Sequence, residues 1–279
     1  MSTSLEELRR IVERISGQTA GLLRDLSGER LDEIVAKQKL GDTTRRIDLI
    51  AEDYVLDMIK NTGIPSLIIT EERGVISIGR EPELIYVIDP LDGSTNYIIG
   101  VPWSAVSIAV SFYKDNARLS DIVAGAVAPI IPRFNVFSFA RGKGVYYGGL
   151  RIEFNEKDFV GRNVLLGYFE SREGARVFKA FMEKTENVKV RSLGCASLEI
   201  VYTAIGRAEL FMDIRGWLRN VDVAAALGIA RELNAYISDS KGASIDSTIT
   251  DIVMVGDVIV ARTKHMYEKA IEAVRAALT

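Results

Sequence analysis

The spacing of hydrophobic and polar residues changes along this sequence between a helical period and short apolar runs. Leu5 to Leu23 and Ile47 to Ile59 carry apolar residues at helical spacing, so we predict two helices there. Ser66 to Ile69 and Leu84 to Ile88 are short apolar runs that are typical of buried strands. Lys37 to Arg46 is polar and contains a glycine, which predicts a loop. The first part of the chain is therefore expected to alternate helix and strand.

A series of strand-like segments follows in the middle of the sequence. These segments are Ala105 to Tyr113, Ile122 to Ala128, Asn135 to Ala140 and Gly144 to Tyr147. Glycine or proline signals separate them, and consecutive strands with tight connections favour an antiparallel meander.

Helix and strand signals alternate again in the last part of the sequence, without an internal repeat or a low-complexity linker. The predicted strands are Val164 to Tyr168, Glu209 to Met212 and Val258 to Ala261. The predicted helices are Glu173 to Lys184, Ala196 to Ile205, Val223 to Leu233 and Lys264 to Leu278. We therefore predict one domain over residues 1–279, of layered helices and sheets (α+β), with a soft division into residues 1–155 and 156–279.

Composition and charge limit the classes of function. Hydrophobic residues make up 48% of the chain and charged residues 26%, which is ordinary for a globular protein. The net charge of -3 offers no basic excess for nucleic acid, and no apolar stretch reaches the roughly 18 residues that span a membrane. Cys195 is the only cysteine, which fits a reducing compartment. We expect a cytoplasmic protein that binds neither nucleic acid nor membranes.

Acidic residues follow two of the predicted strands. Glu71 and Glu72 come directly after one strand, and Asp89 and Asp92 come after the next. Carboxylates gathered at a sheet edge repel one another unless a cation lies between them. Oxygen ligands of this kind suit Mg²⁺, so the two strand ends predict a magnesium site.

The run from Asp89 to Thr95 adds groups that can bind phosphate. Pro90 fixes the backbone after Asp89 and leaves the carbonyl of Leu91 free to act as a ligand. Gly93 permits a tight bend, after which the N–H groups of Gly93, Ser94 and Thr95 can point at an anion. The alternative is a plain turn with an aspartate cap. Because the acids after the neighbouring strand accompany this run, we favour the metal and phosphate site.

The run Asp89 to Asn96 (DPLDGSTN) resembles the signature of the inositol monophosphatase and fructose-bisphosphatase superfamily, the lithium-sensitive Mg²⁺-dependent phosphatases. Asp48 and Ile69 to Glu72 are similar to upstream elements of that family, and Arg191 to Ala196 and Asn220 to Ala225 are similar to downstream ones. The sequence around Asp213 is similar to the archaeal branch, in which many members are dual inositol monophosphatase and fructose-1,6-bisphosphatase enzymes. The resemblance implies an alternating α-β-α-β-α sugar-phosphatase sandwich of mixed and antiparallel sheets.

The resemblance also implies a set of metal ligands. Glu71, Asp89 and the carbonyl of Leu91 would hold one Mg²⁺, and Asp89, Asp92 and Asp222 would hold a second. A third, weaker ion would contact Glu71 and the preceding loop, and Mn²⁺ could substitute for Mg²⁺. From the sequence alone Asp222 could instead be a helix cap, since it lies at a predicted helix start.

Catalytic and substrate-binding roles follow from the same resemblance. Asp48 and the hydroxyl of Ser94 would orient and deprotonate the attacking water, with assistance from Glu71. The family usually has threonine at the position of Ser94; serine keeps the hydroxyl but loses a methyl group that restrains the rotamer. The N–H groups of Gly93, Ser94 and Thr95 would bind the reacting phosphate.

The residues that select the substrate are less well marked. Arg191 is a candidate for binding a second phosphate, with Arg215 and Arg219 as further candidates, although each could be an ordinary surface ion pair. Asp213 could accept a hydroxyl of a polyol, or it could be a charge facing water. Cys195 is expected to be a small packing residue at a helix start.

Other phosphatase mechanisms do not fit the residues present. A cysteine phosphatase needs an arginine six residues after the cysteine, and Val201 occupies that position after Cys195. An aspartyl-phosphate enzyme needs two aspartates with one residue between them, whereas Asp89 and Asp92 have two. His265, the only histidine, cannot build a histidine-rich metal site and is expected on the surface.

The predicted activity is therefore hydrolysis of a small phosphorylated sugar or polyol, such as inositol 1-phosphate or fructose 1,6-bisphosphate. The alternatives are a phosphatase of 3′-phosphoadenosine 5′-phosphate and a non-catalytic relative that has kept the fold. The resemblance implies a homodimer or homotetramer. In the loop of residues 37–46, Lys39 could meet phosphate and Asp42 could recruit the weaker ion.

Overall fold

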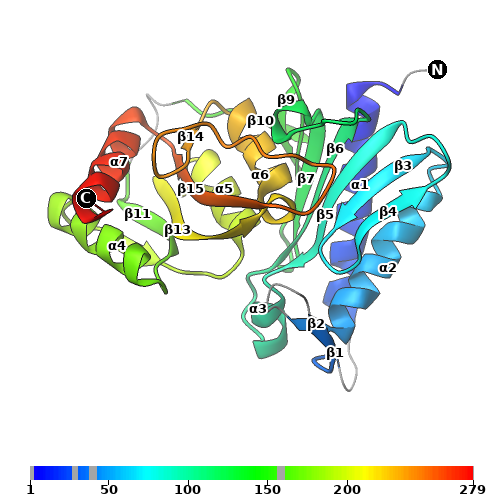
Figure 1. The fold of residues 1–279 in the computed structure, drawn as a ribbon, viewed down its shortest axis with the longest axis horizontal. Helices are drawn as coiled ribbons and strands as arrows, with labels where there is room; N and C mark the ends of the chain where they lie inside the picture. The colour runs from blue at the N-terminus through cyan, green and yellow to red at the C-terminus, as the bar shows by residue number, and fades with distance from the viewer. Residues whose placement is uncertain (1–2, 27–30, 38–42, 156–160, 279) are drawn as a thin grey trace.

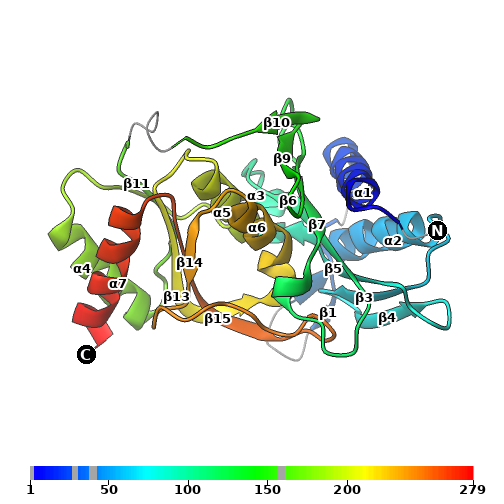
Figure 2. The same ribbon diagram turned by 90° about the horizontal axis from the view of Figure 1, so that it is seen from above.

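The computed structural model describes residues 3–26, 31–37, 43–155 and 161–278. These residues form an eight-stranded sheet, a five-stranded sheet and a two-stranded ribbon. The two large sheets stand side by side with helices between them and on their outer faces, as Figures 1 and 2 show from two directions. The mixed and antiparallel sheets confirm the predicted fold class.

The eight-stranded sheet has the strand order β10-β9-β8-β7-β6-β5-β3-β4. Its strands are β3 (Ser66–Thr70), β4 (Gly74–Ile78), β5 (Leu84–Asp92), β6 (Ala105–Phe112), β7 (Ala124–Pro129), β8 (Phe137–Ala140), β9 (Gly144–Tyr147) and β10 (Leu150–Ile152). β6 to β10 pair with their sequence neighbours in antiparallel fashion, which confirms the meander. β3 and β5 are parallel, with Thr70 opposite Ile88, so Glu71 emerges at the same edge as Asp89.

The five-stranded sheet has the order β12-β11-β13-β15-β14. Its strands are β11 (Val164–Tyr168), β12 (Lys189–Arg191), β13 (Leu210–Arg219), β14 (Tyr236–Ser238) and β15 (Met254–Ala261). The predicted strand at Glu209 to Met212 is too short, because β13 continues to Arg219. The register with β15 is irregular between Asp213 and Leu218, where charged residues and a glycine interrupt the apolar pattern. This extension carries two arginines toward the pocket described below.

The helices form three layers around the two sheets. They are α1 (Leu5–Asp25), α2 (Arg46–Lys60), α3 (Ser94–Ile99), α4 (Arg172–Lys184), α5 (Ala196–Ala204), α6 (Asn220–Glu232) and α7 (Lys264–Leu278), with a short 3₁₀ helix at Leu119–Asp121. α1 and α2 pack on the outer face of the eight-stranded sheet, α5 and α6 lie between the sheets, and α4 and α7 cover the other outer face (Figure 2). Helix and sheet layers therefore alternate, as predicted, and three apolar cores lie between them.

The prediction of a loop from Lys37 to Arg46 is wrong at both ends. β1 (Ile34–Lys37) pairs with β2 (Thr43–Arg45), and α2 already begins at Arg46. The two consecutive threonines at the start of β2 favour extended backbone, and pairing with β1 satisfies its polar groups. Lys39 and Asp42, the two residues for which we predicted contacts with ligands, lie outside the described residues.

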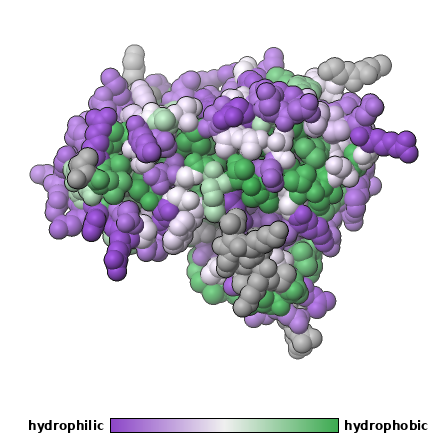
Figure 3. Space-filling view, viewed as in Figure 1, coloured by the Kyte–Doolittle hydropathy of each residue, from purple (hydrophilic) through white to green (hydrophobic). Residues whose placement is uncertain are grey.

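The surface of the molecule mixes polar and apolar residues. Hydrophilic residues surround the face seen in Figure 3, and apolar residues are scattered among them. None of the described helices combines the length and the apolar character that crossing a membrane requires. His265 is exposed on α7, as predicted. The soft division at residues 155 and 156 stays a prediction, because residues 156–160 lie outside the described part of the chain.

Candidate active site

Most of the residues singled out in the sequence line one pocket of about 370 Å³, but Asp48 is not part of its described lining. The pocket lies where the ends of β3 and β5 meet the end of β13 and the starts of α5 and α6. The predicted site residues in its lining are Glu71, Asp89, Leu91, Asp92, Gly93, Ser94, Thr95 and Asp222. These residues come from the ends of β3 and β5, from the start of α3 and from the start of α6, so only the folded chain brings them together.

The end of β5 turns the run of site residues toward the pocket. The register with β6 is irregular between Asp89 and Asp92, and the N–H of Leu91 donates to Oδ1 of Asp89 at 3.0 Å. Gly93 follows with φ of +81°, a conformation that side chains rarely adopt. A Cβ there would lie 3.0 Å from the carbonyl oxygens of Gly194 and Trp103. Glycine is therefore required where the chain leaves β5, and Ser94 and Thr95 then begin α3.

Asp48 and Asp222 occupy the same local position, the third residue of a helix. Oδ2 of Asp48 accepts the backbone N–H of Arg45 at 2.8 Å, and Oδ2 of Asp222 accepts that of Arg219 at 2.7 Å. Each aspartate therefore satisfies a free donor at the start of its helix. For Asp222 this is the capping contact considered above, and it leaves Oδ1 able to face the pocket.

Asp48 is a buried carboxylate with an unusual environment. Only 3% of the residue is exposed, and its Oδ1 has no hydrogen-bond partner among the described residues. Burial raises the pKa of Asp48 to about 7, with further contributions from the charges of Glu72 and Glu71. A carboxylate with such a pKa and a free oxygen is suited to accept a proton near neutral pH.

Four of the pocket carboxylates, Glu71, Asp89, Asp92 and Asp222, disfavour one another's ionisation. Burial raises the pKa of Asp89 well above its ordinary value, and the charges of Glu71, Asp92 and Asp222 raise it further. Burial also raises the pKa of Asp92 to about 6, although hydrogen bonds from Ser197 and Cys195 oppose the shift. Buried carboxylates in mutual contact need positive charge to remain ionised, and hard oxygen donors of this kind fit Mg²⁺.

The start of α5 holds Asp92 in place. The N–H of Ser197 donates to Oδ2 of Asp92 at 2.7 Å, and the thiol of Cys195 donates to the same oxygen at 3.1 Å. Cys195 is fully buried at the start of the helix, so its packing position agrees with the prediction. Its contact with a site carboxylate was not foreseen, since the two residues lie 103 positions apart.

Arg219, one of the further candidates for binding a second phosphate, lines the pocket, but its contacts with two of the pocket acids were not foreseen. Its Nη2 lies 2.5 Å from Oε1 of Glu71 and 3.0 Å from Oδ1 of Asp222. Within the described ranges, no three His, Cys, Asp or Glu side chains surround a common point where a metal ion could sit. The donors for a metal are present, but two of them are held by this guanidinium.

Neither predicted substrate-contacting residue of the five-stranded sheet lies in the described lining of the pocket. Arg191 is exposed, and its Nη1 donates to the carbonyl of Val190 at 2.7 Å. Asp213 is fully buried and accepts Nε and Nη2 of Arg215 at 3.0 and 2.7 Å. Asp213 therefore pairs with Arg215 on the same strand, and its contact with a substrate hydroxyl stays a prediction.

Arg215, another of the further candidates for binding a second phosphate, does line the pocket. Its guanidinium lies 4.2 Å from the ring centre of Tyr168 and 5.0 Å from that of Trp217. Tyr168 and Trp217 also line the pocket, and Trp217 is 57% exposed. The alternation of charged and aromatic residues in the second half of β13 was the available signal for this group.

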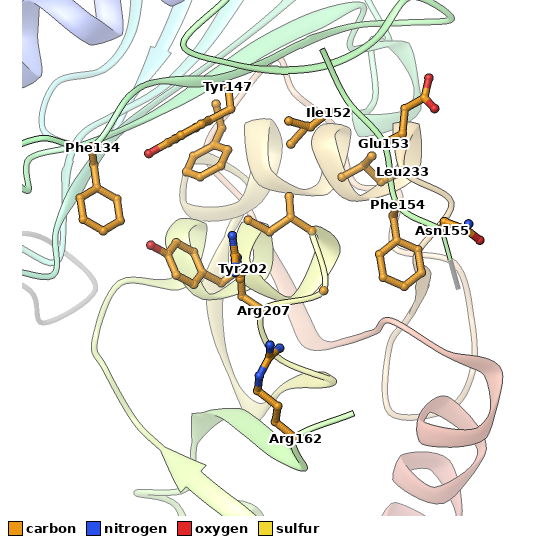
Figure 4. A pocket seen from close by; sticks show the side chains of 13 residues that line it. Phe134, Tyr147, Ile152, Glu153, Phe154, Asn155, Arg162, Tyr202, Arg207 and Leu233 are labelled. Atoms are coloured by element: carbon orange, nitrogen blue, oxygen red, sulfur yellow. The ribbon is translucent and has the colours of Figure 1, made fainter. Parts of the chain in front are cut away.

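A larger cavity of about 690 Å³ lies elsewhere, between the aromatic end of the meander and α5 (Figure 4). Tyr147 and Tyr202 are among the aromatic residues that line it, and Arg162 and Arg207 also belong to its lining. Glu153 supplies the one carboxylate of its described lining, and that side chain is 76% exposed. This cavity is the larger of the two candidate binding sites, but the groups that could bind a metal ion and a phosphate line the smaller pocket.

Comparisons with known proteins give matches along almost the whole chain. A family model described as the inositol monophosphatase family matches residues 4–279. An inositol-1-monophosphatase of Aeropyrum pernix is 39% identical over 260 residues, which cover 91% of this chain and 92% of that protein. A fructose-1,6-bisphosphatase/inositol-1-monophosphatase of Methanocaldococcus jannaschii is 32% identical, covering 84% of this chain and 86% of that one.

A similar fold has been solved for a protein of Pyrococcus horikoshii, described as hypothetical with similarities for inositol-1 monophosphatase. Its TM-score is 0.77 at 26% sequence identity, and the match covers 97% of this chain and 99% of that chain. The similarity therefore extends over both sheets and all three helix layers.

Proposed function

Since this chain belongs to the inositol monophosphatase family, we propose that it is a Mg²⁺-dependent phosphatase that hydrolyses sugar or polyol phosphate monoesters. One observation carries the proposal. Five carboxylates, four of which are the proposed metal ligands, and the backbone of Gly93 to Thr95 line a single pocket at the junction of the two sheets. The first group suits a divalent cation and the second suits a phosphate.

The metal ligands in this proposal are the carboxylates of Glu71, Asp89, Asp92 and Asp222 and the carbonyl of Leu91. The mutual repulsion of the buried acids supports it, since a divalent cation would offset that repulsion. Bound Mg²⁺, as two or three ions, would supply Lewis acidity toward water and the phosphate oxygens. Mn²⁺ has similar ligand preferences and could take its place.

The protein's own groups then orient the reactants and move a proton. The N–H groups at Gly93, Ser94 and Thr95 hold the phosphate oxygens, on which negative charge accumulates during the transfer. Asp48 accepts a proton from the attacking water through its unpartnered Oδ1, and the hydroxyl of Ser94 orients that water. Glu71 assists from the same pocket.

The alcohol part of the substrate is proposed to lie against Arg215 and Trp217. Trp217 presents an exposed ring that can cover the apolar face of a sugar or polyol, and the Arg215 guanidinium can donate to its hydroxyls or to a second phosphate. Arg191 stays a weaker candidate for that second phosphate, because it lies outside the described pocket lining.

Three further features belong to the proposal. The balanced charge and the single cysteine support a protein that works in the cytoplasm, without nucleic acid or membrane partners. A homodimer or homotetramer is proposed from the family. All the proposed ligands, the base and the serine are present, which argues against a non-catalytic relative.

The substrate class can be tested by assaying phosphate release from three esters side by side. We expect kcat/KM for inositol 1-phosphate and for fructose 1,6-bisphosphate to exceed that for 3′-phosphoadenosine 5′-phosphate by at least roughly tenfold. A ratio of this size requires only about one additional good polar contact to the preferred substrate. Turnover of the nucleotide alone would replace the sugar or polyol by a nucleotide as the substrate class. No Mg²⁺-dependent hydrolysis of any ester would support the non-catalytic relative.

The stability of the metal-free protein is expected to fall as pH rises from 5 to 8. The pKa is raised to about 7 for Asp48, about 6 for Asp92 and about 8 for Glu199, chiefly by burial. The folded state therefore binds more protons than the unfolded state in this range, so stability is lost as pH rises through these values. We expect the unfolding midpoint in EDTA to drop by roughly 5 to 10 °C, measured by differential scanning calorimetry.

Magnesium is expected to reduce this drop in the unfolding midpoint, because it would offset the negative charge of Asp92. It would leave the ionisation of Asp48 and Glu199 unchanged. The variant Asp92→Asn is the matched control, since it lacks one of the titrating groups and should show a smaller drop in EDTA. A midpoint that rises from pH 5 to 8 in EDTA would contradict the proposed burial of these acids.

A further inference from the structure

Arg219 connects two acids that come from different layers of the fold. It is the last residue of β13 and directly precedes α6. Glu71 follows β3 of the other sheet, whereas Asp222 lies in the first turn of α6. The Arg219 side chain is 11% exposed, and those of Glu71 and Asp222 are 14% and 11% exposed. A nearly buried cation therefore bridges two nearly buried carboxylates.

The contacts of this guanidinium are directed at specific oxygens. Nη2 lies 2.5 Å from Oε1 of Glu71 and 3.0 Å from Oδ1 of Asp222. Nε donates to Oδ2 of Asp222 at 3.3 Å, an oxygen that also accepts the backbone N–H of Arg219. Both oxygens of Asp222 and one oxygen of Glu71 are thus held by a single residue through its fork geometry.

We propose that Arg219 is a positioning residue that serves as an internal counter-cation for the acidic pocket and competes with Mg²⁺ for Glu71 and Asp222. The inference rests on the proposed function, in which these two carboxylates are metal ligands. Arg219 holds them in position when no divalent cation is bound. To bind there, Mg²⁺ must either replace the guanidinium as the partner of these oxygens or bind next to the positively charged guanidinium.

Electrostatics gives the direction of the effect. A unit positive charge in contact with the ligands repels an incoming divalent cation, and the repulsion is strong at a partly buried site. Arg219 therefore lowers the affinity for Mg²⁺ below the value that the carboxylates alone would give. A purely structural salt bridge would act in the opposite direction, because its loss would disorder the ligands and weaken metal binding.

The test is a calorimetric titration of the whole metal-free protein with MgCl₂, without substrate. We expect Arg219→Gln to lower the apparent Kd for Mg²⁺ by about tenfold relative to the wild type, because the competing charge is gone. Arg219→Lys keeps the charge and is expected to bind Mg²⁺ with an affinity within about threefold of the wild type.

Arg73→Gln is the matched control. Arg73 also bridges two carboxylates, with its Nη1 2.7 Å from Oε2 of Glu52 and its Nη2 2.7 Å from Oδ1 of Asp53. Neither acid belongs to the described lining of the pocket. This variant also loses contacts with two carboxylates, although its side chain is more exposed, at 36% against 11% for Arg219. It should leave the Kd for Mg²⁺ unchanged if the effect belongs to the proposed ligands.

The outcomes separate the two proposals. Equal or weaker Mg²⁺ binding by Arg219→Gln, with normal binding by the wild type, overturns the inference alone. A wild type that binds no Mg²⁺ overturns the proposed metal site together with the inference. If Arg219→Gln does not stay folded without metal, its unfolding midpoint is followed as MgCl₂ increases. A rise steeper than that of the wild type supports the inference, and an equal or shallower rise overturns it.

Discussion

Replacing Asp89 by asparagine is expected to lower kcat/KM for inositol 1-phosphate by at least about a thousandfold. Asp89 lies at the end of β5, is 2% exposed and has three other pocket carboxylates within electrostatic reach. In the proposed site it contributes to both principal metal positions, so its loss removes a shared negative ligand. Asparagine keeps the shape and can still accept the N–H of Leu91, which preserves the local backbone. Initial rates of phosphate release over a range of MgCl₂ concentrations measure the effect.

The control for this variant is Asp57→Asn. Asp57 is an exposed acid on α2, with 70% of its side chain accessible and a surface contact to Lys60. Removing that charge should change kcat/KM less than about twofold, since exposed ion pairs contribute little. An Asp89→Asn enzyme with more than a tenth of the wild-type kcat/KM would exclude Asp89 as a shared ligand.

The second large effect is expected for Asp48→Asn, which should lower kcat by roughly a hundredfold to ten-thousandfold while Mg²⁺ affinity changes little. The asparagine oxygen can still accept the backbone N–H of Arg45, so the start of α2 is preserved. The amide cannot accept a proton as the carboxylate can. Steady-state kinetics and calorimetric Mg²⁺ binding on the same preparation separate the two effects.

Asp222→Asn provides the matched comparison. Asp222 has the same position in its helix and the same capping contact as Asp48, so the loss of the cap should have a similar effect in the two variants, although Asp222 also contacts the Arg219 guanidinium. We expect Asp222→Asn to weaken Mg²⁺ binding and Asp48→Asn to leave it nearly unchanged. If both variants weakened Mg²⁺ binding to the same degree, Asp48 would be a ligand and not the base.

Much of the site could be predicted from the sequence because its acids follow buried strands directly. Parallel pairing of β3 with β5 then places Glu71 beside the end of the strand that carries Asp89. The layers could be predicted for a similar reason, since periodicity marks which face of each helix or strand is buried. Membership in the inositol monophosphatase family, shown by the match over residues 4–279, agrees with the resemblance of the run Asp89 to Asn96.

The partners of charged residues could not be predicted in this way. A charged residue in a sequence gives no sign of whether it faces solvent, a substrate or another charge. Asp213 pairs with Arg215 two residues further along β13, whereas Arg219 meets Glu71 across 148 residues of sequence. The contact between Arg219 and Glu71 depends on how the two sheets are placed relative to each other, which local patterns do not specify.

The most direct test of the proposed site is the release of inorganic phosphate from inositol 1-phosphate by the wild-type protein, measured with increasing MgCl₂ and with EDTA. We expect hydrolysis that rises to saturation with Mg²⁺ and stops in EDTA, because the pocket carboxylates need a divalent cation to act on a phosphate ester. Equal phosphate release in EDTA and in MgCl₂ would contradict a metal-dependent site built around Asp89.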